Sequence, residues 1–570
     1  MSSSLFNDLR LEGKFCDAVI KVADVSFEIH RVILCKCSPY FIALFTHTSH
    51  PDKKVFNIPG LSPDMMQLII EFAYTDSVSV TEENVQELLL AADQLIIMGL
   101  VQTCWDFLEE QLCPENCIGI FQFTGMCSVT ELRHKAYRYI IDHFEKVVVA
   151  EEFLQLSVQQ LTDILGRNDL NVRKESIAYE AVLRWIAHVP EERKAHIAVL
   201  LSQVRLTLMS MDYLRINVIS NELVKNNKKC RPMVRKALCQ LLTNRRSHLC
   251  NHLVPPRLPN AILLAIGGWS TNNSTNFIEA YNVRADCWMK VTHHVEHPCA
   301  YHGTACLNGS VYCVGGFDGV ERFNSVNRFD LRTHTWHDVV PMNHRRSHVS
   351  VTVLDGCIYA MGGSDEHARL CTAERYRPET NQWSCIAPMQ EHRSNASSTT
   401  LHNKIYVCGG FNGTRELQTA ECYSPETNQW TMIARMNYQR NKVGIIAYAD
   451  HIYAVGGFDG STRLCNVEAY NPQNNTWREV SHMSTPRSHF GIEVLDDKLF
   501  VVGGFSGSTG FTTSCNVQCY DVATDEWTGA CDMETTRSAL SCCVLSNLPN
   551  RAEYIDPVTS SRWMMRLLKS

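Results

Sequence analysis

The second half of the chain repeats one pattern six times. Each of the six units contains a Gly-Gly doublet and, further along the chain, a tyrosine or phenylalanine. A tryptophan stands seven residues after each of these aromatics. Self-similarity at a fixed period near 50 residues predicts a repeat protein in which each unit forms one small sheet. The doublets begin, at intervals of 48 and then 47 residues, at Gly267, Gly315, Gly362, Gly409, Gly456 and Gly503.

Each unit contains apolar runs of strand length. Examples are "VSVTVL" (349–354), "CIYAMGG" (357–363) and "TAERY" (372–376), with Asp-Gly or Asn-Gly turn signals between such runs. Four strands of this length fit in 47 residues. A four-stranded sheet repeated radially is a blade of a β-propeller, and a period near 50 with a Gly doublet is typical of its kelch form.

The ends of the repeat region predict how the ring closes. The first unit starts at "AILLAIGGW" (261–269) without a preceding strand, whereas the last unit is followed by "RSALSCCVL" (537–545). We expect this C-terminal strand to complete the first blade, which leaves no open edge. The Gly, Tyr and Trp repeats are expected to be scaffold, because glycine permits close backbone approach and the aromatics supply buried area between blades.

The first half of the chain has a different pattern. Residues 17–60 indicate a hairpin, two helices and a strand, and helical spacing continues from 63 to 112. From 114 to about 245 the pattern is helical throughout. The sequence therefore predicts a multidomain chain with five segments: an α/β domain (1–112), an all-α domain (113–250), a Pro-rich linker (251–260), an all-β six-bladed propeller (261–545) and a tail (546–570).

Composition and charge narrow the function. A net charge of −7 with 45% hydrophobic residues describes an ordinary globular protein whose field attracts neither nucleic acid nor an anionic membrane. No stretch resembles a signal peptide or a membrane span, so we expect a cytoplasmic protein. The 25 cysteines are scattered without a Cys-x-x-Cys pair, and His293, His294, His297 and His302 lack completing ligands. We expect reduced cysteines, no metal and no cofactor.

The order of the segments resembles the kelch-like family, which has a BTB domain, a helical BACK domain and a six-bladed kelch propeller. The residues that carry the resemblance are "FCDAVIKV", "HRVILCKCSPYF", "NDLNVRKESIAYEAVLRW", "VRLTLMSMDYL" and the six repeats. The resemblance implies a non-catalytic adaptor. Its BTB domain would form homodimers and, with the start of BACK, hold the N-terminal part of cullin-3, and its propeller would hold a protein substrate for ubiquitination by the assembled RING ligase. Holding both raises their effective concentration for each other.

The resemblance also assigns residues in the first domain. Asp17 and Arg31 match a buried charged pair of the BTB fold, and Phe45, Leu68 and Tyr74 match positions that face cullin-3. One departure follows "ALF", where family members that bind cullin-3 usually have a hydrophobic residue, any residue and then Glu. This chain instead has Ser49, His50 and Pro51, which removes an apolar contact with cullin-3.

On the propeller, loops should carry the function because packing fixes the blade cores. Matches to the family's aromatic rim follow the Gly doublets, with Ser364 breaking the pattern: Trp269, Phe317, Phe411, Phe458 and Phe505. Matches to its pocket-lining positions stand two residues past a repeated arginine, with Ala539 breaking the pattern: His348, Asn395, Lys442 and His489. The basic residues on this rim favour a substrate segment with acidic or phosphorylated residues. The repeated arginines could equally belong to the scaffold: Arg346, Arg393, Arg440, Arg487 and Arg537.

Other classes of function fit less well. A BTB dimer with kelch propellers could cross-link actin, and Ser49-His50-Pro51 keeps this alternative open. A copper oxidase would need Tyr, His and Cys ligands on one face, whereas the periodic Tyr and Cys stand at strand positions predicted to be buried. A transcription factor is disfavoured, because the sequence shows no DNA-binding module.

Overall fold

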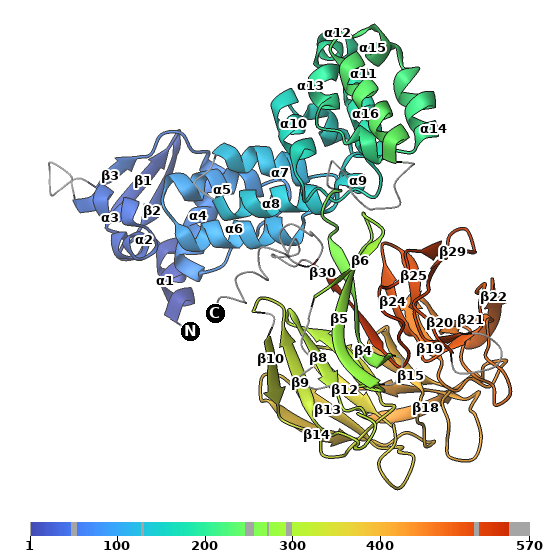
Figure 1. Ribbon diagram of the computed structural model, residues 1–570. Helices are drawn as coiled ribbons and strands as arrows, with labels where there is room; N and C mark the ends of the chain where they lie inside the picture. The colour runs from blue at the N-terminus through green and yellow to red at the C-terminus, as the bar shows by residue number, and fades with distance from the viewer. Residues whose placement is uncertain are drawn as a thin grey trace, which may run out of the picture. The chain divides into compact units, whose positions relative to one another are not determined.

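The computed structural model describes residues 2–46, 54–126, 130–244, 256–270, 273–291, 299–333, 335–506, 512–546 and 554. They form two compact units, residues 1–257 and 258–570, each of which is described by itself (Figure 1). No helix among these residues has the length and apolar character that crossing a membrane requires. Two predicted features lie outside the described residues: Ser49, His50 and Pro51, and His293, His294 and His297.

The first part of unit 1 has the predicted α/β composition. Strands β1 (Ala18–Val22) and β2 (Val25–Ile29) form an antiparallel hairpin, and β3 (Val55–Asn57) pairs parallel with β1. The predicted helix at 63–75 is confirmed with those bounds, and the residue before it, Ser62, is the N-cap, whose hydroxyl accepts the Met65 N–H. The helices are α1 (Ser2–Leu11), α2 (Arg31–Cys37), α3 (Pro39–Thr46), α4 (Pro63–Thr75), α5 (Val85–Gln94) and α6 (Met98–Glu110).

The second part of unit 1 is helical, as predicted, and buries one continuous apolar core. Within it the Trp185 indole N–H donates to the Leu156 carbonyl at 2.9 Å. Arg257 ends the unit with a buried ion pair to Glu175, 2.6 Å between Nε and Oε1. The helices are α7 (Cys117–Phe123), α8 (Thr130–Asp142), α9 (Phe144–Val147), α10 (Val158–Gly166), α11 (Glu175–His188), α12 (Pro190–Arg193), α13 (Ile197–Leu201), α14 (Met211–Tyr213), α15 (Glu222–Asn226) and α16 (Cys230–Asn244).

Unit 2 is a six-bladed propeller, which confirms the predicted fold (Figure 1). Its described residues form six four-stranded antiparallel sheets and one small rim sheet, β23-β26-β27. The blades comprise, in order, β30 (Ser541–Ser546), β4 (Ala261–Ser270), β5 (Asn273–Asn282) and β6 (Cys287–Lys290); β7 (Gly303–Leu307), β8 (Ser310–Val314), β9 (Val326–Asp330) and β10 (Thr335–Val339); β11 (Ser350–Leu354), β12 (Cys357–Met361), β13 (Ala373–Arg377) and β14 (Gln382–Ile386); β15 (Ser397–Leu401), β16 (Lys404–Cys408), β17 (Ala420–Ser424) and β18 (Gln429–Ile433); β19 (Gly444–Tyr448), β20 (His451–Val455), β21 (Val467–Asn471) and β22 (Thr476–Val480); and β24 (Gly491–Leu495), β25 (Lys498–Val502), β28 (Val517–Asp521) and β29 (Glu526–Ala530). The rim strands are β23 (Arg487–Ser488), β26 (Phe505–Ser506) and β27 (Thr512–Thr513).

The predicted closure of the ring is confirmed. Strand β30, from the C-terminal end, pairs antiparallel with β4, from the start of the repeat region, over Ser541↔Ile266 to Ser546↔Ala261. The segment beyond β30 has one described residue, Tyr554, which is buried and donates its hydroxyl to the Leu331 carbonyl. At this position the predicted tail is therefore packed against the propeller core.

The repeated Tyr and Trp pack as predicted for scaffold. Tyr376 and Trp383 are directly opposite on β13 and β14, with ring centroids 5.3 Å apart. The Trp383 indole N–H reaches the Val340 carbonyl in the crossover from the preceding blade, at 3.0 Å. A Cβ at Gly315, where φ is +64°, would stand 2.3 Å from the Arg346 carbonyl oxygen, so the Gly doublet is required by close backbone approach.

The repeated arginines belong to the scaffold, which decides an alternative that the sequence left open. Arg440 is fully buried in a crossover, donates to the carbonyls of Gly456 and Asn466, and pairs with Glu468 at 2.9 Å. Four of the five arginines face a buried glutamate in this way: Arg346 with Glu374, Arg393 with Glu421, Arg440 with Glu468 and Arg537 with Glu279.

Two junctions between blades differ from this pattern. In one of them Gln518 stands at the glutamate position, the Arg487 guanidinium donates to the backbone and side-chain oxygens of Asn516, and burial lowers the pKa of Arg487 to about 10. At the remaining junction the arginine position holds Cys299 and the glutamate position holds Asn327. There, too, the buried His302 stands where other blades carry an apolar residue.

Candidate functional site

Six residues form a closed ring of backbone hydrogen bonds at one end of the propeller's central channel. Each donates its N–H to the carbonyl of the previous member, and the first returns to the last, with distances of 2.8 to 3.3 Å. Every member has a left-handed backbone, with φ between 55° and 61°. The ring comprises Tyr301, His348, Asn395, Lys442, His489 and Ala539.

Five of these positions were named by the sequence, and Tyr301 was missed. Its blade lacks the repeated arginine, because Cys299 stands in that place, so counting two residues past an arginine gives no position there. The repeat period would have found it, since Tyr301 precedes His348 by 47 residues. The structure brings all of the predicted pocket-lining residues together.

Aromatic side chains of the ring gather over the channel mouth. The Tyr301 and His348 rings stack with centroids 4.1 Å apart, and the His489 ring lies 5.2 Å from that of Tyr301. Burial, followed by the nearby charges of Arg369, Lys442 and Arg322, lowers the pKa of His348 to about 3. Burial and Lys442 also hold the pKa of His489 well below its usual value. Both imidazoles are therefore neutral at pH 7 and donate or accept hydrogen bonds without adding charge.

Around this ring lies a rim of half-buried aromatics and cations. Trp269 and the four predicted phenylalanines stand after the Gly doublets, where each pairs across its loop in a short antiparallel bridge. Cations lie over the four phenylalanine rings at 5.5 to 5.7 Å from the centroids, within cation–π range. The pairs are Arg322 with Phe317, Arg369 with Phe411, Lys442 with Phe458 and Arg463 with Phe505.

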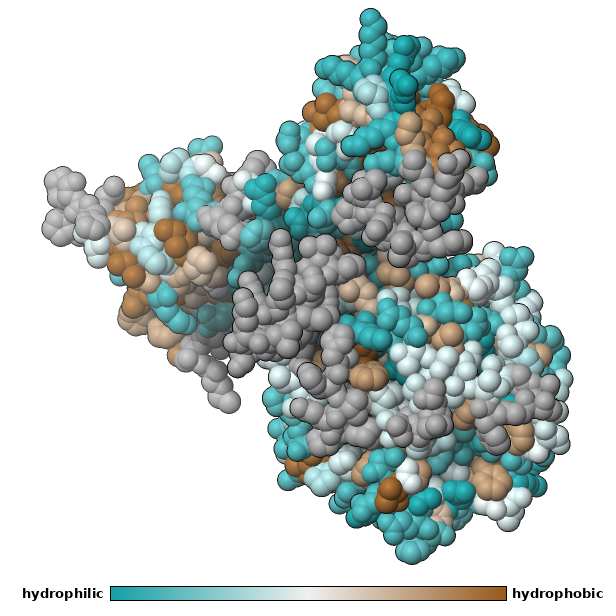
Figure 2. All heavy atoms as spheres, in the orientation of Figure 1, coloured by the Kyte–Doolittle hydropathy of each residue, from teal (hydrophilic) through white to brown (hydrophobic). Residues whose placement is uncertain are grey.

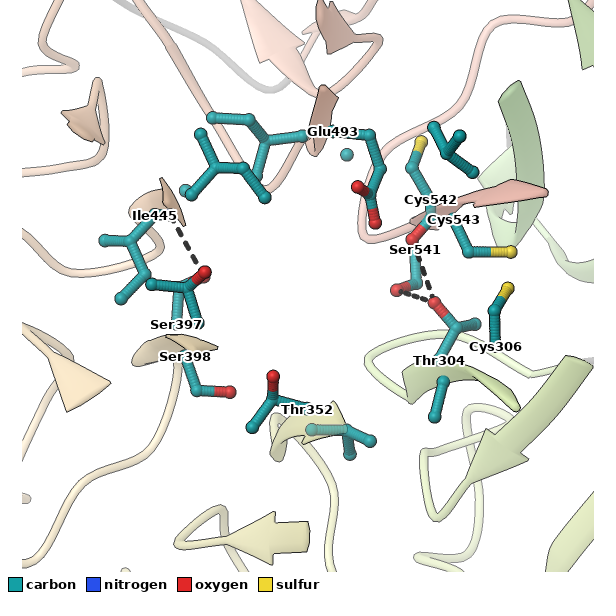
Figure 3. A pocket seen from close by; sticks show the side chains of 18 of the residues that line it. Thr304, Cys306, Thr352, Ser397, Ser398, Ile445, Glu493, Ser541, Cys542 and Cys543 are labelled. Atoms are coloured by element: carbon teal, nitrogen blue, oxygen red, sulfur yellow. Dashed lines mark hydrogen bonds between the residues drawn. The ribbon is translucent and has the colours of Figure 1, made fainter. Parts of the chain in front are cut away.

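The channel itself is a cavity of about 340 Å³ lined by the inner strand of every blade. Hydroxyl groups line much of its wall, including those of Thr304 and Ser541, which are 2.7 Å apart (Figure 3). The carboxyl group of Glu493 is turned toward the part of the wall that carries Ser541 and Cys542 (Figure 3). Burial raises the pKa of Glu493 to about 8, so this carboxyl is largely protonated at pH 7.

In unit 1 the predicted cullin-facing residues are not together on the surface. Tyr74 is 2% exposed, and its hydroxyl accepts the His30 backbone N–H at 2.8 Å. Phe45 is 8% exposed and packs on Phe56, with ring centroids 4.9 Å apart. Leu68 is half-buried. Phe45 and Tyr74 are therefore core residues of unit 1, and of the three predicted contacts Leu68 is the one that is more than marginally exposed.

The predicted charged pair also differs from its expected environment. The Asp17 carboxylate accepts the Arg31 backbone N–H at 2.8 Å, so the two residues do meet. However, Asp17 is exposed and Arg31 is half-buried in this chain, so the pair is not buried within unit 1. The Arg31 guanidinium lies over the Phe56 ring, 5.3 Å from its centroid, where the aromatic face favours the cation.

Two surfaces of unit 1 are suited to partners. A groove of about 400 Å³ is lined by residues of α7, α8 and α10, including Phe121, Arg133 and Tyr137. Large apolar side chains are exposed near the N-terminus: Leu5, Phe6, Leu11 and Phe15, the last 82% exposed. Figure 2 shows hydrophobic residues gathered on the α/β part of the chain, whereas the propeller surface in that view is mostly hydrophilic.

One group of side chains could be read as metal ligands. The candidate atoms of His344, Glu374 and Cys385 lie within 4.8 Å of one another. The Glu374 carboxylate is already occupied, because it pairs with Arg346 at 2.9 Å and accepts the Asn343 backbone N–H at 2.8 Å. A cation at this carboxylate would be placed against the buried guanidinium, so the group is not suited to hold one.

Comparison with known proteins agrees with this architecture. The chain matches the BTB/POZ domain over residues 6–112, the "BTB And C-terminal Kelch" (BACK) domain over 117–218, a kelch-repeats domain named for KLHDC2, KLHL20 and DRC7 over 257–444, and the kelch motif over 440–484 and 486–533. The chain therefore contains a BTB domain, a BACK domain and kelch repeats, in that order.

Named relatives of this BTB, BACK and kelch protein include Kelch-like protein 3 from Homo sapiens and from Bos taurus. Each is 36% identical over 321 residues, and Kelch-like protein 3 from Mus musculus has the same identity over the same length. The match covers 55% of this chain and 54% of each relative. The chain thus aligns with about half the length of these curated relatives.

Proposed function

We propose that this protein is a non-catalytic substrate adaptor of a cullin-3 RING ubiquitin ligase. The observation that carries the proposal is the combination of BTB and BACK domains with a closed propeller whose mouth bears a varied aromatic and basic rim. Loops on a rigid scaffold are where recognition residues are expected. The BTB and BACK unit would hold cullin-3, the propeller would hold the target protein, and proximity alone would then accelerate ubiquitination.

Cullin-3 would be held by unit 1 through surface that the structure leaves open. The groove of α7, α8 and α10 combines aromatic rings with Arg133, whose guanidinium lies 5.0 Å from the Phe121 ring centroid. Such a groove suits an extended peptide segment with apolar anchors. Leu68 is the predicted contact that has exposed surface.

A homodimer is the second partner in this proposal. Exposed Leu5, Leu11 and Phe15 lie on or just after α1, and burying side chains of this size in a partner surface would favour association. Two copies would double the number of sites for substrate and for cullin-3. We place this adaptor in the cytoplasm. Within the family, phrases such as "GIEVLDDKLFVVGGF" and "TAERYRPETNQW" resemble kelch-like protein ten.

The test is a calorimetric titration of the full chain with the N-terminal region of cullin-3. Submicromolar binding is expected, and Leu68→Asp should weaken it at least tenfold. Val199→Asp, at an exposed position of α13, is the matched control and should bind as the unchanged chain does. Tyr74→Phe removes a buried hydroxyl that accepts the His30 backbone N–H, so it should lower the stability of unit 1 and leave the affinity of the folded chain for cullin-3 unchanged.

No detectable heat at several temperatures, with a folded dimer confirmed by sedimentation, would contradict the adaptor function. That result would favour the alternative of an actin-binding dimeric scaffold, which co-sedimentation with filaments would then test.

A further inference from the structure

One position on the propeller rim carries a different charge in different blades. It is the residue that pairs, in an antiparallel bridge, with the aromatic or serine after each Gly doublet. Because the bridge fixes its backbone, this residue occupies the same place in every blade. The six residues, in blade order, are Ser274, Arg322, Arg369, Glu416, Arg463 and Thr513.

Arg322 and Arg369 are the one adjacent pair of arginines in this set. Both charges act on the imidazole of His348, which lies in the backbone ring at the channel mouth. The Arg369 guanidinium is positioned by the Ser364 hydroxyl at 2.6 Å and by the Phe411 ring. Neither arginine is in an ion pair with any carboxylate of the described chain, and Arg322 Nε is buried without a hydrogen-bond partner there. Asp365, the acidic residue of the neighbouring turn, instead accepts the backbone N–H groups of His367 and Ala368.

Glu416 reverses the charge in the next blade. Its carboxylate is half-buried and receives one long contact, from the Asn441 side-chain amide at 3.5 Å. It is in no ion pair within the described residues. Lys442 feels its charge, but the Lys442 ammonium lies over the Phe458 ring instead. A fixed carboxylate among arginines would repel an anionic ligand at this blade and attract a cationic one.

We propose that the rim recognises a protein segment carrying two opposite charges: an acidic or phosphorylated residue held between Arg322 and Arg369, and a basic residue at Glu416. The proposal rests on the adaptor function and deepens it by defining the substrate by its charge pattern. Guanidinium groups bind carboxylate and phosphate oxygens in a planar, bidentate manner, which makes the arginine pair the anion subsite. A nucleic acid would gain from the arginines but would meet repulsion at Glu416, so a protein segment fits the whole rim better.

The replacement Glu416→Arg is suited to test this, because Arg322, Arg369 and Arg463 show that the scaffold accepts arginine at this place. Arg369→Ser likewise introduces the residue that the first blade has there. A random peptide library would be selected against the immobilised full chain and against both variants. Peptides selected by the unchanged chain should combine an acidic and a basic residue at a consistent spacing, whereas peptides selected by Glu416→Arg should lose the basic residue.

Affinities of the selected peptides would then be measured by fluorescence polarisation. Exchanging the acidic and basic residues of a selected peptide should weaken its binding at least tenfold, and Arg369→Ser should weaken the original peptide about tenfold. Equal selection by the unchanged chain and Glu416→Arg, or selected peptides without charge, would overturn the proposal. So would tighter binding of a labelled single-stranded oligonucleotide than of any selected peptide. Cullin-3 titration of both variants separates this outcome from failure of the adaptor function, because neither substitution should change that binding.

Discussion

The propeller uses arginine in two regions for opposite purposes. The junction arginines, of which Arg440 is typical, are fully buried and recur in five of the six junctions, and four of the five pair with glutamate. The rim arginines, such as Arg369, are half-buried, lie over aromatic rings and occur at three of six equivalent positions. A buried charge without an ionic partner is costly, so a junction arginine and its glutamate depend on each other, whereas a rim charge is partly solvated and can change sign from blade to blade without a matching change elsewhere.

Removing a junction carboxylate should have the largest effect. Glu468→Gln leaves the Arg440 guanidinium buried without a charged partner, and uncompensated buried charges cost about 3–5 kcal/mol. The propeller's unfolding transition, followed by denaturant titration of the full chain, should move to lower denaturant by a corresponding amount. A loss below about 1 kcal/mol would show that the junction pairs contribute little.

Replacing His302 should stabilise the junction that lacks an arginine. Both ring nitrogens of this buried histidine have no hydrogen-bond partner among the described residues, and other blades have Val349, Val443 or Leu540 in its place. Unsatisfied buried polar groups cost about 1–3 kcal/mol, so His302→Leu should raise the free energy of unfolding by that amount.

The same substitution should change the dependence of stability on pH. Burial lowers the pKa of His302 to about 4, so the folded state keeps the ring neutral while the unfolded state takes up a proton below its ordinary pKa of about 6.5. Stability is therefore lost as the pH falls from about 6.5 to about 4. His302→Leu should show a shallower loss across that window, and an unchanged slope would contradict the assigned pKa.

Restoring a junction carboxylate should have a smaller, stabilising effect. Gln518→Glu places a carboxylate at the position where four other junctions pair a glutamate with the buried arginine. The Gln518 side-chain oxygen already accepts the Ser484 backbone N–H, and a carboxylate oxygen could keep that hydrogen bond. Because desolvating the new charge offsets part of the attraction, we expect a gain of about 1 kcal/mol. Gln518→Leu is the control, since it removes the hydrogen bonds without adding charge and should destabilise the propeller.

Rim substitutions should have the smallest effect on stability. Glu366→Gln breaks an exposed ion pair with Arg345, of 3.3 Å between partners about half exposed, and such pairs contribute about 0–1 kcal/mol. Arg369→Ser should likewise lower the melting temperature far less than Glu468→Gln does. A large loss from either would remove the distinction between scaffold and rim arginines.

Much of the fold could be predicted from the sequence, because the repeat shows six versions of one blade and the features they share indicate the common structure. The spacing of Tyr376 and Trp383 predicts their cross-strand pairing, and the missing first strand predicts the pairing of β30 with β4. The sequence could not show whether the Arg346 side chain is buried within the propeller or exposed on its rim. The repeat period gives the position of a residue in its blade but not how far its side chain is buried. The partner Glu374 stands 28 residues away, and only the folded blade brings the two together.

The site in unit 1 was less predictable for a related reason. Phe45 and Tyr74 were assigned by likeness to family positions, and a matching residue type does not report how far its ring is buried. Tyr301 shows the opposite case. The repeat period predicts its position, whereas counting two residues past the repeated arginine does not, because its blade has Cys299 in place of that arginine.

Closure by β30 also orders events during synthesis of the protein. Strand β4 begins at residue 261 and its partner at residue 541, so the ribosome must add 280 residues before the first blade can gain its inner strand. At about 5–20 residues per second this delay lasts about 14–56 s. Throughout it β4 has an unpaired edge, available to any other strand in the cell. A premature stop codon that removes β30 would make this exposure permanent, so loss of the last strand should cause aggregation rather than a shortened active protein.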